Sequence, residues 1–265
     1  MERVTPADRV EEVLGDAERA VMARVLAEEG ARREHVVVYL SGAHAYGFPS
    51  PDSDLDLKAI HVAPTSELLG FEPPSPTVDR AEVLDGIEID YTSNELAHAL
   101  SGILAGNGNF LERALGRMVP FASPLLDGLR AVAKASLSRR VHRHYRGFAQ
   151  NQRALLDKDP TAKKLLYVLR TALTGIHLLE TGALEPDLTR LMDAYALEDA
   201  IELIVRKCAG ERIGLDAETL ARWRARLDAL FARLDAARER SPLPEDPPNE
   251  REAKEWLLSV RRARL

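Results

Sequence analysis

The chain has 265 residues, enough for one large domain or two modest ones, each with its own core. Its composition, 45% hydrophobic and 29% charged, is ordinary for a globular protein, and no apolar run approaches the roughly 20 residues of a membrane-spanning helix. The net charge of −6 argues against a protein that coats nucleic acid by charge alone. The first residues lack the apolar core of a signal peptide, and the single Cys208 excludes an internal disulfide and a cysteine-based zinc cluster. We therefore expect a cytoplasmic protein.

The first 120 residues alternate between helix and strand patterns. Apolar residues at helical spacing predict a helix over about residues 7–30. Short β-branched or alternating runs predict strands over residues 35–41, 53–62 and 81–93. The last of these is expected to form a hairpin with its turn at Asp85-Gly86, and four prolines predict a loop over residues 64–80.

Beyond residue 120 every periodic segment is helical. The predicted helices cover residues 123–156, 161–182, 187–210, 216–240 and 249–263. A proline-rich stretch, 241–248, separates the last two as a turn or short linker. The sequence therefore predicts an α/β (α+β) protein, with a small mixed-sheet domain over residues 1–120 and an all-helical domain over residues 121–265.

Aspartates alternate at the start of the second predicted strand, at Asp52, Asp54 and Asp56. In a strand, residues two apart project from the same face about 6.5–7 Å apart, so Asp54 and Asp56 aim their carboxylates at one spot. Converging carboxylates suit Mg²⁺, with Mn²⁺ as a second choice, and a third ligand is expected from Glu88 or Asp90 on the later acidic strand. Two such ions about 3.5–4 Å apart clamp both oxygens of an in-line phosphoryl displacement.

A glycine-containing turn joins the two strands. Gly42 and Gly47 permit the close backbone approach that a triphosphate needs, and a short helix there points free N–H groups at phosphates. Aspartate-rich turns are also common at strand starts, where they cap and bend the chain, and D-x-D alone favours that interpretation by about four to one. The combination of strand, glycine turn, D-x-D and a later acidic strand reverses the preference.

On these residues the sequence resembles the polymerase β-type nucleotidyltransferase superfamily, with Gly42-Ala43 in the turn, ten residues, and then Asp54-Leu55-Asp56. More narrowly, AYGFPSPDSDLDLKAI and IDYTSNELAHALSGILAGN look like a bacterial group of predicted nucleotidyltransferases linked to RNA repair. KKLLYVLRTAL (163–173) is similar to a Lys-Lys-x-Leu-Tyr-x-Leu-Arg segment of that group. The resemblance covers roughly residues 35–190.

The resemblance implies that Asp54 and Asp56 hold the metal ions and that Asp90, rather than Glu88, is a further metal ligand or the base. It also implies that an NTP binds to the turn and to one later helix. The implied nucleotide-binding residues are Ser41, Gly42, Ala43, His44, Tyr46, Lys163, Lys164, Tyr167 and Arg170.

Two features qualify this assignment. Ala43 departs from the superfamily, whose serine bonds a phosphate, and His44 stands where an arginine is frequent. Without the resemblance, the cations over 163–170 indicate an exposed basic helix face with Tyr167 half buried.

The leading hypothesis is a metal-dependent nucleotidyltransferase that moves an NMP from an NTP to an acceptor hydroxyl and releases pyrophosphate. The basic segment 139–153 favours an RNA end as acceptor, although a charge run by itself is more often a solvated helix face. The same fold also modifies proteins and small molecules. A non-catalytic nucleotide-binding regulatory module, which Ala43 favours, and a metal-dependent NTP hydrolase are also compatible with these motifs.

Overall fold

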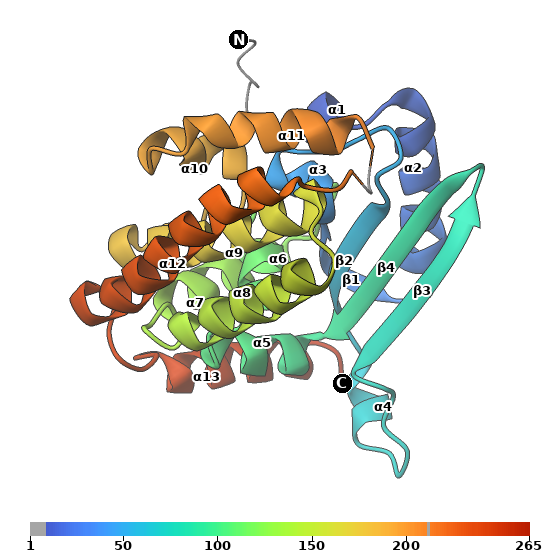
Figure 1. Ribbon diagram of the computed structural model, residues 1–265. Coiled ribbons are helices and arrows are strands. Elements are labelled where there is room, and N and C mark those ends of the chain that lie inside the picture. The colour runs from blue at the N-terminus through green and yellow to red at the C-terminus, as the bar shows by residue number, and fades with distance from the viewer. Residues whose placement is uncertain (1–8, 211–212) are drawn as a thin grey trace. The chain divides into compact units, whose positions relative to one another are not determined.

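The computed structural model describes residues 9–210 and 213–265, which contain a five-stranded sheet and are mainly helical elsewhere (Figure 1). The chain divides into two compact units. The described residues of the first, the sheet unit, are 9–42, 54–137 and 247–265. Those of the second, the helical unit, are 43–53, 138–210 and 213–246.

Both units are assembled from separated stretches of chain, so a single division near residue 120 does not coincide with them. The sheet unit also contains residues 121–137 and 247–265, which were expected in the helical domain. The helix over 125–135 contacts the first strand, and the C-terminal helix contacts two helices of the sheet unit. Helical periodicity predicts the buried face of a helix, but it does not say which partner covers that face.

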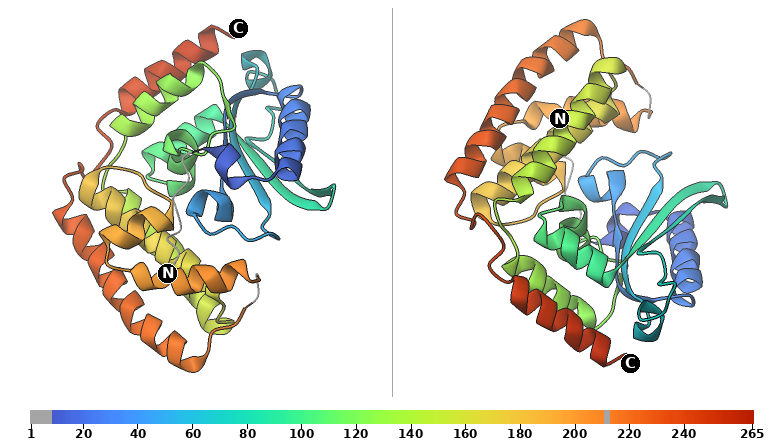
Figure 2. Two further views of the ribbon diagram at one scale, coloured as in Figure 1. Left: turned by 90° about the horizontal axis from the view of Figure 1, so that it is seen from above. Right: turned by 90° about the horizontal axis from the view of Figure 1, so that it is seen from below.

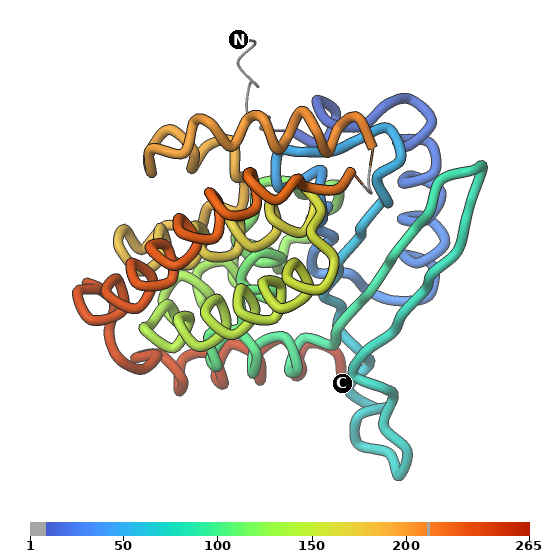
Figure 3. Tube along the Cα trace, viewed as in Figure 1, coloured from blue at the N-terminus to red at the C-terminus, as the bar shows by residue number. Residues whose placement is uncertain are grey.

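The sheet has the strand order β3-β4-β2-β1-β5. The strands are β1 (Glu34–Leu40), β2 (Leu55–Val62), β3 (Thr77–Leu84), β4 (Ile87–Glu95) and β5 (Phe121–Ala122). β2 and β4 run parallel and the other neighbours antiparallel, which confirms the predicted mixed sheet. β3 and β4 form the predicted hairpin (Figure 3); its turn residues Asp85 and Gly86 have φ values of 51° and 82°, typical of a type I′ turn.

Helices cover both faces of the sheet. The helices of the sheet unit are α1 (Val10–Val13), α2 (Asp16–Gly30), α4 (Thr65–Leu68), α5 (Leu96–Leu104), α6 (Gly108–Leu115), α7 (Leu125–Ala135) and α13 (Glu250–Arg262). Figure 2 shows α2 on one face of the sheet and α5 with α6 on the other. Two predicted helices are interrupted. The helix over 7–30 breaks at Leu14, which is extended, because Glu18 caps the backbone N–H of Gly15 at 2.7 Å and starts α2.

The second interruption ends α7 at Ser136, within the helix predicted over 123–156. The Ser136 hydroxyl donates to the carbonyl of Val132 at 2.8 Å and to the side chain of Asn249 at 3.0 Å. These side-chain bonds compete with continuation of the helix and fix its end against the residue that precedes α13.

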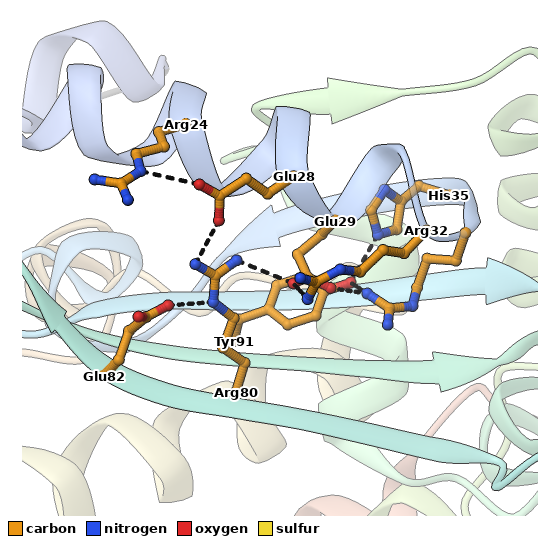
Figure 4. Close-up of polar contacts among 9 residues, drawn as sticks. Arg24, Glu28, Glu29, Arg32, His35, Arg80, Glu82 and Tyr91 are labelled. Carbon is orange, nitrogen blue, oxygen red and sulfur yellow. Dashed lines mark hydrogen bonds and ion pairs between the residues drawn. The ribbon is translucent and has the colours of Figure 1, made fainter.

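A network of charged side chains holds α2 against the sheet (Figure 4). It consists of Arg24, Glu28, Glu29, Arg32, Arg33, His35, Arg80, Glu82 and Tyr91 and is called the α2 network below. At its centre Glu29 is 1% exposed and accepts from Arg32 and Arg80, each at 3.0 Å, and from Arg33. A buried carboxylate with several guanidinium partners is strongly stabilised in its charged form.

The helical unit is built around α9. Its elements are α3 (Gly42–Tyr46, whose first residue belongs to the sheet unit), α8 (Val141–Lys158), α9 (Ala162–Thr181), α10 (Leu188–Ala194), η1 (Glu198–Ala200), α11 (Ile201–Cys208) and α12 (Ala217–Arg240). α9 is packed by α8, α10, α11 and α12, which explains why nearly every residue from Leu165 to Leu179 is buried. The helix predicted over 187–210 is divided into α10, η1 and α11. None of the described helices is long and apolar enough to cross a bilayer.

Candidate active site

The acids of β2 and β4 lie side by side because these two strands are parallel neighbours. The ladder pairs Asp56 with Asp90, so their side chains leave the same face of strands that lie about 4.8 Å apart. Lys58 follows Asp56 by two residues and shares that face. Its ammonium lies 2.8 Å from Asp90 Oδ2 and 3.6 Å from Asp56 Oδ1, and it also donates to the Asp90 carbonyl at 3.2 Å. These three residues are called the β2–β4 cluster.

The register separates the two candidates for the third acid. The β2–β4 ladder begins at Leu55 and Ile89, which places Asp90 inside it, opposite Asp56. Glu88 lies one residue before the ladder and is exposed. Asp90 is therefore the acid of β4 that the backbone places beside Asp56.

Burial dominates the electrostatics of Asp56. It raises the pKa of the Asp56 carboxyl to about 6; Lys58 opposes this shift, while the nearby charges of Asp90 and Asp54 add to it. Asp54 itself is exposed and immediately precedes β2. Both Asp90 and Asp54 thus act electrostatically on the Asp56 carboxyl.

The glycine turn is fastened to the strand that carries the acids. The backbone N–H of Ser41 donates to the carbonyl of Asp56 at 2.8 Å. Gly42 has a φ of 65°, and a Cβ atom there would collide with Asp56 Oδ2. A Cβ atom at Gly47, with a φ of 84°, would likewise collide with Asp187 Oδ1. The sequence predicted that a triphosphate would approach the backbone of these glycines closely. In this structure the carboxylates of Asp56 and Asp187 take that position.

The donor set of the β2–β4 cluster fits a cation. Among the described residues, no three His, Cys, Asp or Glu side chains are gathered closely enough to hold a metal ion. Asp56 and Asp90 nevertheless share one cation, the Lys58 ammonium, and Asp54 precedes the strand. Carboxylate oxygens are the ligands that Mg²⁺ and Mn²⁺ prefer, so the site for either ion stays a prediction that the chemistry of these residues supports.

The other predicted nucleotide-binding residues lie in the helical unit. In α3, Ala43, His44 and Tyr46 are all buried, between 2% and 6% exposed. α9 contributes Tyr167, which is half buried and meets the ring of Tyr46 edge-on, with 5.9 Å between centroids. Phe48 meets the same Tyr167 ring at 5.7 Å. The sequence predicted none of these aromatic contacts, because they join residues more than one hundred positions apart.

The cations of α9 do not form one exposed face. Arg170 is 3% exposed, and its guanidinium lies 3.7 Å from the centre of the Tyr46 ring, a cation–π contact. Lys163 and Lys164 are half buried at the start of the helix, where Lys164 pairs with Asp159. The structure therefore places Arg170 in the interior with Tyr46, and the two lysines nearer the surface.

Two lysines outside the predicted site contact either its acids or the loop that precedes Asp54. The contact of Lys58 could have been predicted from the sequence, since a cation two positions after Asp56 must share its face of the strand. No feature of the sequence indicated the contact of Lys207. It is fully buried on α11 and donates to Ser50 Oγ at 2.6 Å and Ser53 Oγ at 2.7 Å, which holds the loop that ends just before Asp54.

The sheet is mixed, acids are paired across its two parallel strands, and a glycine turn lies beside them, while the rest of the protein is mainly helical. These features define a polymerase β-like nucleotidyltransferase fold. Residues 18–259 match the RNA repair pathway DNA polymerase beta family, and the chain belongs to that family.

The curated relatives are distant in sequence. The chain is 28% identical over 218 residues to the uncharacterized protein MJ0002 of Methanocaldococcus jannaschii, covering 80% of this chain and 88% of that one. It is 27% identical over 187 residues to the uncharacterized protein YcgL of Bacillus subtilis, covering 67% and 71%. The crystal structure of a nucleotidyltransferase-like protein from Exiguobacterium sibiricum matches at 13% identity, over 94% of this chain and 80% of that one, with a TM-score of 0.31. That structural similarity is too weak to bear on the details of the site.

Proposed function

We propose that this protein is a divalent-metal-dependent nucleotidyltransferase that transfers an NMP from an NTP to an acceptor hydroxyl and releases pyrophosphate. The pairing of Asp56 with Asp90 on adjacent parallel strands, around a shared cation, supports the proposal most directly. Asp54, Asp56 and Asp90 are the proposed ligands of Mg²⁺ or Mn²⁺. Such an ion, when bound, lowers the pKa of the acceptor hydroxyl and neutralises charge on the triphosphate.

The chain's own residues have distinct parts in this proposal. Asp90 is the more accessible acid, with 55% of its side chain exposed against 24% for Asp56, so it is suited to meet the acceptor hydroxyl. Asp56, with its pKa near 6, is mostly ionised at neutral pH and can serve as a ligand. The surface-facing Lys163 and Lys164 are the proposed partners of the NTP phosphates, and buried Arg170 acts by positioning Tyr46.

The proposed acceptor is an RNA end in the cytoplasm. Its support is the family, whose description names an RNA repair pathway, and not the basic segment on α8. Two arginines of α8, and Arg140 just before it, are paired with acids of the helical unit. The pairs are Arg140 with Asp246 at 2.8 Å, Arg146 with Asp235 at 3.1 Å and Arg153 with Asp228 at 2.6 Å. Arginines already engaged within the protein offer less charge to a phosphate backbone.

Transfer of label from α-labelled NTPs to a mixture of cellular RNA and protein, with Mg²⁺ or Mn²⁺ present, tests the proposal. The wild type is expected to label RNA. The Asp54→Ala/Asp56→Ala double variant and the Asp90→Ala variant are expected to lose at least about a thousandfold in rate, because the metal ligands supply most of the charge stabilisation. Glu88→Ala is the matched control, since it removes an exposed acid of the same strand outside the ladder and should leave the rate unchanged.

Each other outcome points to a different function. Label on protein in place of RNA would show that the acceptor is a protein, and it would still support the proposed transferase activity. Free nucleotide product without labelled macromolecule would indicate an NTP hydrolase. Nucleotide binding with neither product would contradict the proposal and favour a regulatory binding module. Equal activity in wild type and the Asp54→Ala/Asp56→Ala variant would contradict the role of these two acids.

A further inference from the structure

Lys58 lies in the position that a cation shared by Asp56 and Asp90 has to take. Its ammonium is within ion-pair distance of both carboxylates, at 2.8 Å and 3.6 Å, and only 18% of its side chain is exposed. The parallel register fixes the two acids side by side, and the two-residue spacing fixes Lys58 on their face. The contact therefore follows from the backbone.

The charges around this position do not balance. Asp54, Asp56 and Asp90 supply three carboxylates, of which Asp54 and Asp90 raise the cost of ionising Asp56, and Lys58 supplies one positive charge. A buried carboxylate without a counter-ion is expensive, so the ammonium stabilises the ionised acids when no other cation is present. A divalent cation would supply more charge at the same place.

We propose that Lys58 is a built-in counter-ion that holds the cation position between Asp56 and Asp90 and that a divalent metal ion must displace. This inference rests on the proposed function for the role of the two acids as metal ligands. A lysine suits exchange, because its ammonium is a single point charge on a flexible four-carbon stem. Lys58 thereby stabilises the paired acids in the metal-free protein and lowers the affinity of the site for metal.

Mn²⁺ binding measured by isothermal titration calorimetry at neutral pH, without nucleotide, tests the inference. Lys58→Met removes the competing charge and should bind Mn²⁺ at least about tenfold more tightly than wild type. Lys58→Arg keeps the positive charge and should stay within about threefold of wild type. Lys134→Met, which removes an exposed lysine on α7, controls for the change in net charge and should behave like wild type.

Unchanged or weaker Mn²⁺ binding by Lys58→Met overturns the inference, as does a failure of both wild type and variant to bind Mn²⁺. Loss of the counter-ion raises repulsion between the acids, so the variant could be too unstable to measure. In that case the wild type gives the answer through acylation of its lysines by an amine-selective reagent, followed by mass spectrometry. Mn²⁺ should increase labelling of Lys58 and leave Lys134 unchanged; equal labelling of Lys58 with and without Mn²⁺ contradicts the displacement.

The two proposals fail in distinguishable ways. If Lys58→Met tightens Mn²⁺ binding but the wild type transfers no label from NTPs, the counter-ion role of Lys58 is supported and the proposed transferase function is wrong. If the wild type transfers label but Lys58→Met binds Mn²⁺ like wild type, the proposed function is supported and Lys58 is only a structural ion pair.

Discussion

Two clusters of charged residues occupy opposite faces of the same sheet, and their charges are balanced differently. In the α2 network, four arginines face three glutamates, and the buried Glu29 has three guanidinium partners. In the β2–β4 cluster, Asp56 and Asp90 share the single ammonium of Lys58, with Asp54 nearby. One cluster is complete within the chain, while the other has an excess of negative charge.

The difference separates stability from function. Buried charges that are fully paired hold elements together, as the α2 network holds α2 to the sheet. Acids that stay under-compensated cost stability and are retained where a cation or substrate completes them. Mutations in the α2 network should therefore affect stability with little effect on nucleotide transfer, and mutations of Asp56 and Asp90 should do the reverse.

The largest expected effect on stability comes from Glu29→Gln. Loss of this buried carboxylate leaves Arg33 and Arg80 short of a partner, so the free energy of unfolding should fall by about 3 kcal/mol. Urea denaturation measures the change. Glu255→Gln on α13 is the control: its side chain is 66% exposed in a 3.8 Å pair with Arg251, and its loss should cost no more than about 0.5 kcal/mol. Equal losses in the two variants would refute the structural role of the α2 network.

An intermediate effect is expected from Gly42→Ala. The φ of 65° strains any side chain there, and the added Cβ pushes against Asp56 Oδ2, so the variant should lose about 2 kcal/mol and also bind Mn²⁺ more weakly. Gly86→Ala has the same kind of backbone strain, with a φ of 82°, but nothing lies within 4 Å of its Cβ. Gly86→Ala should lose stability alone, measured by thermal unfolding and calorimetry. Unaltered Mn²⁺ binding in Gly42→Ala would show that its contact with Asp56 is irrelevant to the site.

The smallest effect concerns the pH dependence of His35, in the α2 network. Burial, with Arg33 and His61 nearby, lowers the pKa of His35 to about 4, and its Nε2 lies 2.7 Å from the Tyr91 hydroxyl. Because the folded pKa is below the unfolded value of about 6.5, the unfolded state takes up a proton first, and stability is lost as pH falls from about 6.5 through 4.

His35→Gln should reduce the stability difference between pH 7 and pH 5 by about 1 kcal/mol. Denaturation midpoints at the two pH values measure it. His98→Gln, at an exposed histidine of α5, should leave the wild-type difference intact. A pH dependence in His35→Gln that equals that of wild type would mean that His35 is not held neutral.

Most of the secondary structure could be predicted from local pattern. Alternating and β-branched runs located β1, β2 and the β3–β4 hairpin, and apolar spacing located α9 and α12 within two residues. The predictions that were wrong in detail concern helix interruptions, at Leu14, Ser136 and within 187–210, and the loop predicted over 64–80, which contains α4 and the start of β3. Helical spacing continues across such breaks, whereas a capping side chain or a tertiary hydrogen bond ends the helix.

The sequence by itself determined the polymerase β-like class of the protein and placed Asp54, Asp56 and a later acidic strand as candidate ligands, since side-chain alternation along a strand is local. The resemblance already implied Asp90 rather than Glu88, and only the tertiary structure showed that Asp90 lies opposite Asp56, because the register of β2 with β4 joins residues 34 positions apart. Only the tertiary structure showed that Lys207 donates hydrogen bonds to the loop before Asp54 and that the Arg170 guanidinium contacts the Tyr46 ring. Which side chains meet across distant segments depends on how whole faces pack, and no short stretch of sequence carries that information.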